Sequence, residues 1–401
     1  MDFSATLLDW FRENGRDLPW RQTRDPYAIW LSEIILQQTQ VKQGWDYWER
    51  FMRRWPTVEA LAAATEDEVL REWQGLGYYS RARNLHHAAR QVVEMGGFPQ
   101  TLEGLRSLKG VGDYTAAAIG SIAFGLPAAV VDGNVYRVLA RHFGIDTPIN
   151  TTEGKKLFQT LAQSLLPSSE NFDISPSSSP APRSSFLVPP SSSPAPRSSF
   201  LVPRSSFLVP PSSSPAPRSS FLVPPSSSPV PPSSEYNQAI MDFGAIQCTP
   251  QSPRCLICPL METCDALRTG RVAQLPVKQK TLKVKERHLS YIYIRCGGQV
   301  AIHRRGAGDI WQGLWEPYLE TDDHQLQPKG SYTVLQQGVK HVLTHRVLLA
   351  DFALWQPEER PLLPPDYIWV DEAALDDYAV PRLVERLYAQ VRLRATTNSS
   401  E

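Results

Sequence analysis

No segment of this sequence is both apolar and long enough to cross a bilayer, and no signal peptide is recognisable. We therefore expect a soluble, cytoplasmic protein with no membrane partner. The formal net charge is zero, because 41 basic residues balance 41 acidic ones. The zero total hides a polarised chain, since a basic run at 278–287 is followed by an acidic C-terminal part, and such an arrangement steers binding.

Cysteine is scarce, with five residues in 401, and four of them fall in one short stretch. Their spacing is C-x6-C-x2-C-x5-C, at Cys248, Cys255, Cys258 and Cys264. In a reducing compartment this clustering favours a metal centre over disulfides. Zinc and iron–sulfur centres both use thiolates, but zinc ribbons favour two separated pairs, so a single loop favours a [4Fe–4S] cluster. Cys296 stands alone in an expected strand and is interpreted as a buried thiol.

Residues 168–234 lack the composition of a folded core. The unit Ser-Ser-Ser-Pro-Ala-Pro-Arg-Ser-Ser-Phe-Leu-Val-Pro starts at 177, 191 and 212. Dense proline forbids regular structure, and one short apolar triplet per unit cannot form a core. This segment is predicted to be a largely disordered insertion between two helices.

The stretch 31–41 combines one carboxylate, Glu33, with the glutamines Gln37, Gln38 and Gln40. We place Glu33 in the first turn of an apolar helix and the glutamines at its next turn. Burial raises the pKa of a carboxyl group toward a value useful for a general acid, whereas a helix N-terminus lowers it. An exposed glutamate beside a polar face is the alternative.

Two further stretches combine aromatic and basic residues. Trp20-Arg21 suits the wall of a base pocket, although a core tryptophan beside a solvated arginine is equally compatible. The segment 75–84 pairs two glycines with Tyr78, Tyr79 and two arginines. That combination brings stacking faces and phosphate ligands close to a flexible backbone.

A tight Gly110-Val-Gly112 turn joins two apolar helices and is typical of a helix-hairpin-helix motif, which presents backbone N–H groups to a phosphate. Asp132 follows another apolar run and precedes Gly133. It is a good helix N-cap, and it also fits a carboxylate held close to DNA.

From residue 288 onward, alternating strands and a terminal helix predict an α+β domain. A Trp-rich turn at 308–317 resembles the Nudix fold, but the acidic cluster of Nudix hydrolases is absent, so diphosphate hydrolysis is not expected. Thr344 and His345 lie on an expected loop between strands, where they suit base recognition.

Together these motifs resemble the endonuclease III superfamily of DNA glycosylases and, within it, the MutY adenine glycosylases, over nearly everything except the repeat. The resemblance implies a multidomain protein, with an all-α helix-hairpin-helix core, a [4Fe–4S] loop and a C-terminal α+β Nudix-like domain. It implies a monomer near the nucleoid that excises adenine mispaired with 8-oxoguanine or guanine in double-stranded DNA.

The resemblance also implies roles for single residues. Glu33 is the acid that protonates adenine at N7, and Asp132 stabilises or captures the oxocarbenium-like sugar. Substrate contacts are expected from Trp20, Arg21, Gln38, Tyr78, Asn134, Gln238, Thr344 and His345, with Gln38 and Tyr78 as wedges in the duplex. Phosphate contacts are expected from Gly110 and Gly112.

Tyr114 occupies the position where bifunctional relatives carry a Schiff-base lysine, so we predict a monofunctional enzyme. The alternatives are an endonuclease III-like pyrimidine glycosylase and lyase, and a non-catalytic mismatch-binding protein. The family commonly has Phe-Ser-His where this chain has Leu343-Thr344-His345, so discrimination against guanine is expected to be weaker.

The predicted domains divide the chain as follows: a six-helix domain with the hairpin at 22–126; a cluster domain at 1–21 and 127–270, interrupted by 168–234; a basic linker at 271–287; and an 8-oxoguanine-recognition domain at 288–392.

Overall fold

The computed structural model describes residues 2–167, 232–279, 284–320 and 332–398. Nearly all of the predicted insertion, residues 168–231, therefore lies outside the described residues, as do residues 280–283 of the predicted linker. The last three residues of the predicted insertion are instead helical. Pro232 begins that helix, a position where its fixed φ angle and missing N–H are tolerated.

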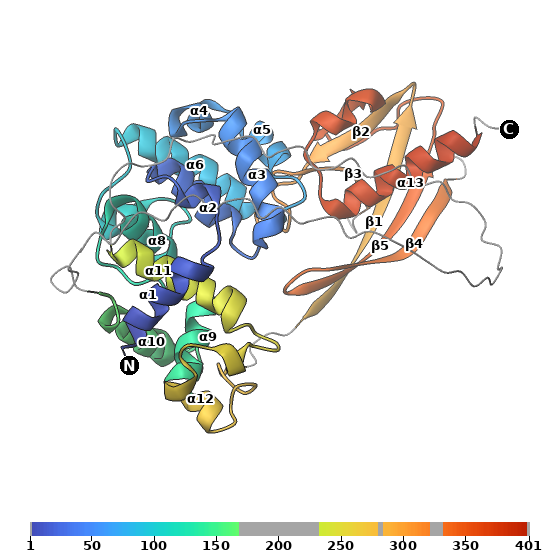
Figure 1. Ribbon diagram of the computed structural model, residues 1–401. Helices are drawn as coiled ribbons and strands as arrows, with labels where there is room; N and C mark the ends of the chain where they lie inside the picture. Colours follow the sequence, from blue (N-terminus) through green and yellow to red (C-terminus); the bar gives the residue numbers. More distant parts are fainter. Residues whose placement is uncertain (1, 168–231, 280–283, 321–331, 399–401) are drawn as a thin grey trace, which may run out of the picture.

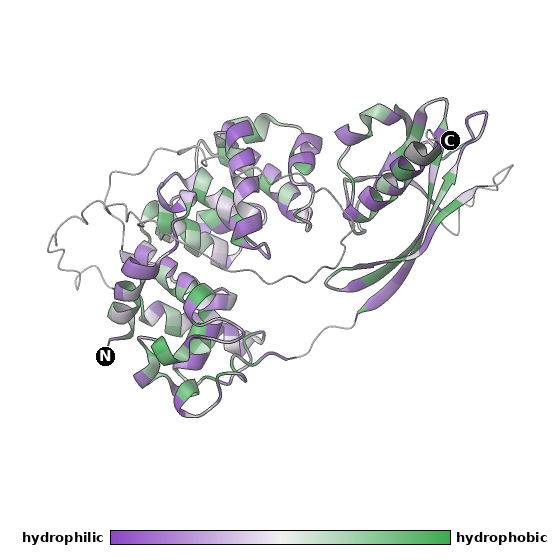
Figure 2. Cartoon of the chain, turned by 45° about the vertical axis from the view of Figure 1, so that its right-hand side comes forward, coloured by the Kyte–Doolittle hydropathy of each residue, from purple (hydrophilic) through white to green (hydrophobic). Residues whose placement is uncertain are grey.

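The described residues of the N-terminal part of the chain form helices and no strand (Figure 1). Its α-helices are α1 (Phe3–Asn14), α2 (Pro26–Ile35), α3 (Val41–Arg54), α4 (Val58–Ala63), α5 (Glu66–Glu72), α6 (Ser80–Glu94), α7 (Leu102–Ser107), α8 (Asp113–Phe124), α9 (Gly133–His142), α10 (Thr152–Ser164), α11 (Pro232–Asp242) and α12 (Asp265–Arg268). Figure 2 shows these helices striped with hydrophobic and hydrophilic residues, as expected for helices that bury one face.

The helical part contains two separate apolar cores. One is built mainly from residues between Leu18 and Ile119, and the other joins the first helix to residues between Ala117 and Leu275. Helix α8 belongs to both cores, and it packs against α2, α7 and α11. The cleft described below lies between elements of these two cores.

The described residues of the C-terminal domain form one six-stranded mixed sheet. Its strands are β1 (Lys285–Cys296), β2 (Gln299–Arg304), β3 (Trp315–Glu320), β4 (Thr333–Val342), β5 (Arg346–Trp355) and β6 (Tyr367–Asp371), in the order β4-β5-β1-β3-β2-β6. Strands β1 and β5 are parallel, and the other pairs are antiparallel. Helix α13 (Arg382–Asn398) covers one face, where its apolar residues complete the larger of the two sheet cores (Figure 1).

The structure corrects several expectations about these elements. Residues 22–126 contain seven α-helices rather than six. Strand β1 begins at Lys285, inside the predicted linker, since residues 285–287 pair with β5. Strands β3 and β6 were not predicted from the sequence. Cys296 is buried, as predicted.

The sheet domain is docked on the helices α5 and α6. Leu314 and Ala379 are buried in the first helical core, and the Arg83 guanidinium donates to the carbonyl of Gln312 at 2.5 Å. Arg304 pairs with Asp67 at 2.8 Å across the same boundary. Apolar and polar contacts both cross this boundary, so the two parts pack directly against each other.

Among the described residues, no helix combines the length and the apolar character that a membrane crossing requires.

Candidate active site and cysteine centre

Glu33 lies in the last turn of α2, not in the first turn of a helix as predicted. The helix begins at Pro26, and the Asp25 side chain caps it by accepting from the backbone N–H of Tyr27 at 3.0 Å. The helix ends at Ile35, so Gln38 stands in the turn that follows and not on the helix. The helix dipole at this end disfavours a negative charge, which is opposite to the effect expected from the sequence.

Burial dominates the acid–base behaviour of Glu33. The residue is only 8% exposed, and burial raises the pKa of its carboxyl group to about 7. The Tyr114 hydroxyl donates to Glu33 Oε2 at 2.8 Å and opposes this shift, whereas the nearby charge of Asp132 adds to it. A carboxyl group with this pKa is partly protonated near neutral pH, as a general acid requires.

Asp132 is the N-cap of α9, and it also faces the cleft that holds Glu33. Its Oδ1 accepts from the backbone N–H groups of Asn134 and Val135, each at 2.8 Å. Burial raises the pKa of Asp132, although these hydrogen bonds and the charge of Arg137 oppose the shift. Because one carboxylate oxygen accepts both backbone hydrogen bonds, the role as a helix cap is compatible with a role in the cleft.

Asn134 holds the second carboxylate oxygen rather than standing free for a substrate. Its side-chain amide donates to Asp132 Oδ2 at 2.7 Å and accepts from Arg137 at 2.9 Å. Arg137 also donates to the backbone carbonyls of Gly244 and Cys248, at 2.6 Å and 2.7 Å. The orientation of Asp132 is thereby tied to the start of the cysteine loop.

Trp20 and Arg21 sit on a short 3-10 helix (Pro19–Arg21) at the edge of the cleft. Trp20 is 6% exposed and packs edge-on against Trp48, so it is largely a core residue. Arg21 binds both oxygens of the fully buried Asp242, each at 2.7 Å. Burial alone would raise the pKa of Asp242, but hydrogen bonds from Arg21 and Arg16 hold it below its usual value.

We expect Asp242→Asn to destabilise the helical part by about 3 kcal/mol, because it leaves the Arg21 and Arg16 charges uncompensated in a partly buried site. Urea unfolding followed by far-UV circular dichroism measures the change. The control is Asp377→Asn, which removes a surface partner of Arg71 and should cost under about 1 kcal/mol. Equal stability of the two variants would contradict this assignment.

Glu33, Asp132, Gln238 and Gln38 line one cleft together with Trp20, Arg21, Tyr114 and Asn134. Counted to its open mouth, the cleft holds about 1610 Å³ of empty space, enough for an extruded nucleobase and its sugar. The Gln238 amide donates to Ser234 at 3.0 Å, which fixes its orientation on α11. Gln38 is exposed at the rim and has a left-handed φ of 57°.

Tyr78, Thr344 and His345 line a second cleft, at the boundary between the helical part and the sheet domain. Thr344 and His345 form the two-residue tip between β4 and β5, closed by a 2.8 Å hydrogen bond from Leu343 N–H to the Arg346 carbonyl. The hydroxyl groups of Tyr78 and Thr344 lie 2.5 Å apart. The substrate contacts predicted from the sequence thus fall into two separate clefts.

The predicted hairpin is present between α7 and α8. Gly110 has a φ of 80°, and a Cβ there would stand 2.7 Å from Asn84, so the position requires glycine. Nothing lies within 4 Å of a Cβ built on Gly112, the N-cap of α8, which leaves the first N–H groups of that helix accessible. This geometry suits an anion.

The residues not predicted from the sequence contact the predicted ones directly, but they lie far from them in the chain. Tyr114 was considered only as the lysine position, yet its hydroxyl contacts Glu33, 81 residues away in the chain. Asp242 contacts Arg21 across 221 residues. No local spacing signals such pairs. The true start of α2 did have a signal, because Asp25-Pro26 is a favourable N-cap followed by proline.

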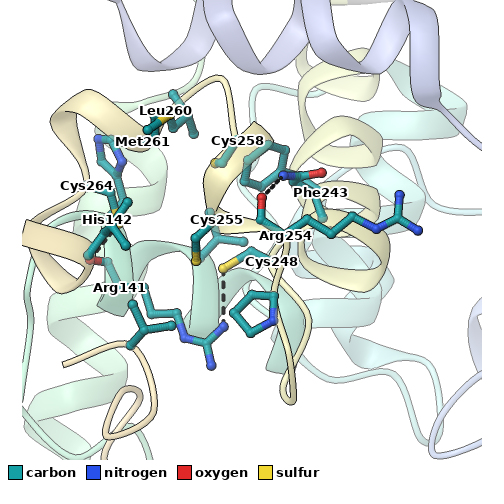
Figure 3. Close-up of a pocket in the computed structure, with 15 residues that line it drawn as sticks. Arg141, His142, Phe243, Cys248, Arg254, Cys255, Cys258, Leu260, Met261 and Cys264 are labelled. Atoms are coloured by element: carbon teal, nitrogen blue, oxygen red, sulfur yellow. Dashed lines mark hydrogen bonds between the residues drawn. The ribbon is translucent and has the colours of Figure 1, made fainter. Parts of the chain in front are cut away.

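The four clustered cysteines surround one hollow of about 430 Å³, open solvent included (Figure 3). The buried Arg141 guanidinium lies against them and donates to Cys248 Sγ at 3.4 Å. Burial raises the pKa of the Cys258 thiol to about 11. Within the described ranges, no three His, Cys, Asp or Glu side chains are placed to hold a single metal ion.

Comparisons with known proteins agree with this architecture. Residues 31–164 match the family described as HhH-GPD superfamily base excision DNA repair protein, and residues 290–390 match the NUDIX domain. The predicted helix-hairpin-helix core and Nudix-like domain are thereby confirmed.

Several relatives are named adenine DNA glycosylase. That of Mus musculus is 36% identical over 288 residues, which are 68% of this chain and 44% of the mouse protein. That of Buchnera aphidicola subsp. Schizaphis graminum is 26% identical over 404 residues, 96% of this chain and 97% of its own. A thermostable thymine-DNA glycosylase structure has a TM-score of 0.48 and 26% identity, covering 67% of this chain and 95% of that one. The chain spans less than half the length of the mouse relative.

Proposed function

Because the chain belongs to the HhH-GPD superfamily and, within it, to the MutY group, we propose that it is a monofunctional DNA glycosylase that removes adenine mispaired with 8-oxoguanine or guanine. The observation that carries this proposal is a pair of carboxyl groups, Glu33 and Asp132, on one cleft. Burial raises the pKa of both groups, but their hydrogen bonds differ, since Glu33 accepts one from Tyr114 whereas Asp132 accepts several from Asn134 and Val135. Carboxyl groups in unlike environments divide acid and stabilising roles in glycoside cleavage.

Glu33 supplies the proton. The adenine leaves the stack and enters the cleft, where the protonated Glu33 delivers its proton to N7 of the base. The electron pair of the bond between the base and the sugar then moves into the base, and an oxocarbenium-like sugar remains. Tyr114 orients the carboxyl group through its hydrogen bond to Oε2.

Asp132 faces the positive charge that develops on the sugar. Its oxygens are held by backbone and side-chain donors on α9, so the carboxylate is oriented before the substrate arrives. A water molecule then adds to the sugar carbon and loses a proton to the ionised Glu33, which restores the acid. With tyrosine at position 114, no amine is available there to form a Schiff base, which supports a monofunctional reaction.

The opposite base is read in the second cleft. Tyr78, Thr344 and His345 converge there from a helix-to-helix turn and a hairpin tip, so the two domains recognise it together. Leu343 packs against the sheet core, where the family commonly has phenylalanine. Phosphate groups of double-stranded DNA are contacted by the N–H groups at the Gly110–Gly112 turn.

Cys248, Cys255, Cys258 and Cys264 hold a [4Fe–4S] cluster. Four thiols around one hollow, with the Arg141 cation beside them, suit the ligands and the charge of such a centre. When bound, the cluster fixes the loop that contacts Arg137.

Acid catalysis by Glu33 predicts that excision slows as pH rises through about 7, because only the protonated carboxyl group donates. Tyr114→Phe removes a hydrogen bond that favours the ionised form, so the pKa of Glu33 should rise and the alkaline limb should move to higher pH. Single-turnover rates between pH 5 and 9, about two units on either side, measure both effects.

Tyr47→Phe is the matched control, since its hydroxyl donates to a backbone carbonyl, that of Gln74, outside the cleft. It should leave the alkaline limb in place. An alkaline limb that stays put or moves to lower pH in Tyr114→Phe would contradict the assignment of Glu33 as the acid.

A panel of duplexes tests the substrate proposal. Free adenine should be released from adenine paired with 8-oxoguanine, more slowly from adenine paired with guanine, and not from adenine paired with thymine. Release of a pyrimidine instead, or no release despite tight binding to the mispair, would overturn the proposed function.

A further inference from the structure

Arg81 is a buried cation that no carboxylate neutralises within the described part of the chain. It lies on α6, is 9% exposed, and no salt bridge among the described residues includes it. Burial lowers the pKa of its guanidinium to about 10. A buried charge destabilises a protein unless its donors are hydrogen-bonded, so the hydrogen-bond partners of this side chain indicate its role.

The guanidinium joins two turns that are 40 residues apart in the sequence. One terminal nitrogen donates to the carbonyls of Ile34, Ile35 and Gln37, at 3.0 Å, 2.9 Å and 2.5 Å. The other donates to the carbonyls of Leu76 and Gly77, at 3.4 Å and 3.3 Å. Arg81 therefore caps the last carbonyls of α2 and also closes the turn before α6.

The residues that follow Gln37 and Gly77 in the chain have an unusual backbone conformation. Gln38 has a φ of 57° and Tyr78 a φ of 47°, both in the left-handed region that residues with side chains rarely adopt. Arg81 binds the carbonyl of Gln37 and that of Gly77, which belong to the peptide units leading into these two residues. Both side chains are exposed, Gln38 at the first cleft and Tyr78, at 49%, at the second. Strained, exposed residues held by a buried group are typical of functional positions.

We propose that Arg81 is a positioning residue that holds the Gln38 turn and the Tyr78 turn as one rigid unit, so that both side chains enter a DNA duplex together. The entry into DNA rests on the proposed function, whereas the rigid coupling does not. The coupling links recognition of the opposite base at Tyr78 to extrusion of the target base at Gln38. Lysine cannot replace this arginine, because a single ammonium group cannot span two sets of carbonyls as the planar guanidinium does.

Hydrogen exchange of the free protein tests the coupling without DNA. In Arg81→Lys, the backbone N–H groups of residues 36–40 and 75–79 should both lose protection by about tenfold or more, while α8 stays unchanged. The control is Arg90→Lys on the same helix, whose guanidinium contacts His86 and the carbonyl of Ala62 outside both turns. Loss of protection in one turn alone, or in neither, would overturn the coupling.

A double-mutant cycle tests the consequence on DNA. The duplex carries 2-aminopurine opposite 8-oxoguanine, and its fluorescence rises when the base leaves the stack. Arg81→Lys should reduce extrusion by about 10- to 100-fold. The effects of Gln38→Ala and Tyr78→Ala on extrusion should be non-additive when Arg81 is present, and they should become additive in the Arg81→Lys background. Additive effects in the wild type would overturn the proposal. If the wild type extrudes 2-aminopurine but releases no adenine from a duplex with adenine opposite 8-oxoguanine, the proposed function fails while the coupling stands.

Discussion

Glu33→Gln is expected to lower the single-turnover rate of adenine release by about 10²- to 10⁴-fold, the usual contribution of a general acid. Glutamine matches glutamate in size and can still accept the hydrogen bond from Tyr114, so the pocket should keep its shape. What it loses is the proton that the buried carboxyl group carries near neutral pH. The pH dependence of any residual rate should lose its alkaline limb near 7.

The matched control is Glu59→Gln, an exposed glutamate on α4 that is remote from the cleft. It should excise adenine at the wild-type rate. Binding of the mispaired duplex by Glu33→Gln should stay within about tenfold of the wild type, because only the proton transfer is removed. A Glu33→Gln variant with a wild-type excision rate would eliminate this residue as the acid.

Asp132→Asn is expected to slow adenine release by about 10²- to 10³-fold, because it removes the negative charge that faces the developing cation. The substitution separates the two roles of the residue. Asparagine is as good an N-cap as aspartate, so a purely structural Asp132 would tolerate the change. The backbone N–H groups of Asn134 and Val135 would still find an acceptor.

Asp25→Asn provides the comparison, since Asp25 caps α2 in the same way but does not line the cleft. Its excision rate should match the wild type. If Asp132→Asn and Asp25→Asn behaved alike, with folding intact by circular dichroism, Asp132 would be a cap and nothing more.

The fold was largely predictable because its signals are local. Apolar periodicity identifies α1, and the Gly110–Gly112 turn identifies the hairpin before α8. The prediction placed the start of strand β1 three residues too late. Lys285, Glu286 and Arg287 are charged, and they belong to the strand because they pair with β5. Tertiary pairing overrides composition at such edges.

The site was less predictable because its geometry depends on contacts between distant segments. The sequence identified Glu33 and Asp132 as carboxylates beside apolar runs, but not which effect controls the pKa of Glu33. The pKa depends first on the burial of Glu33 and then on its hydrogen bond from Tyr114, and both are set by contacts between distant segments. Equally, nothing local distinguishes Arg81 from Arg83, although the first is buried between two turns and the second contacts the sheet domain.

The most direct measurement is single-turnover cleavage of a duplex with one adenine opposite 8-oxoguanine, read with and without alkali, for the wild type beside Glu33→Gln. The wild type should give strand breaks only after alkali, and these should disappear in Glu33→Gln. Breaks without alkali would show a lyase and contradict the role given to Tyr114, and alkali-dependent breaks that persist in Glu33→Gln would contradict the acid.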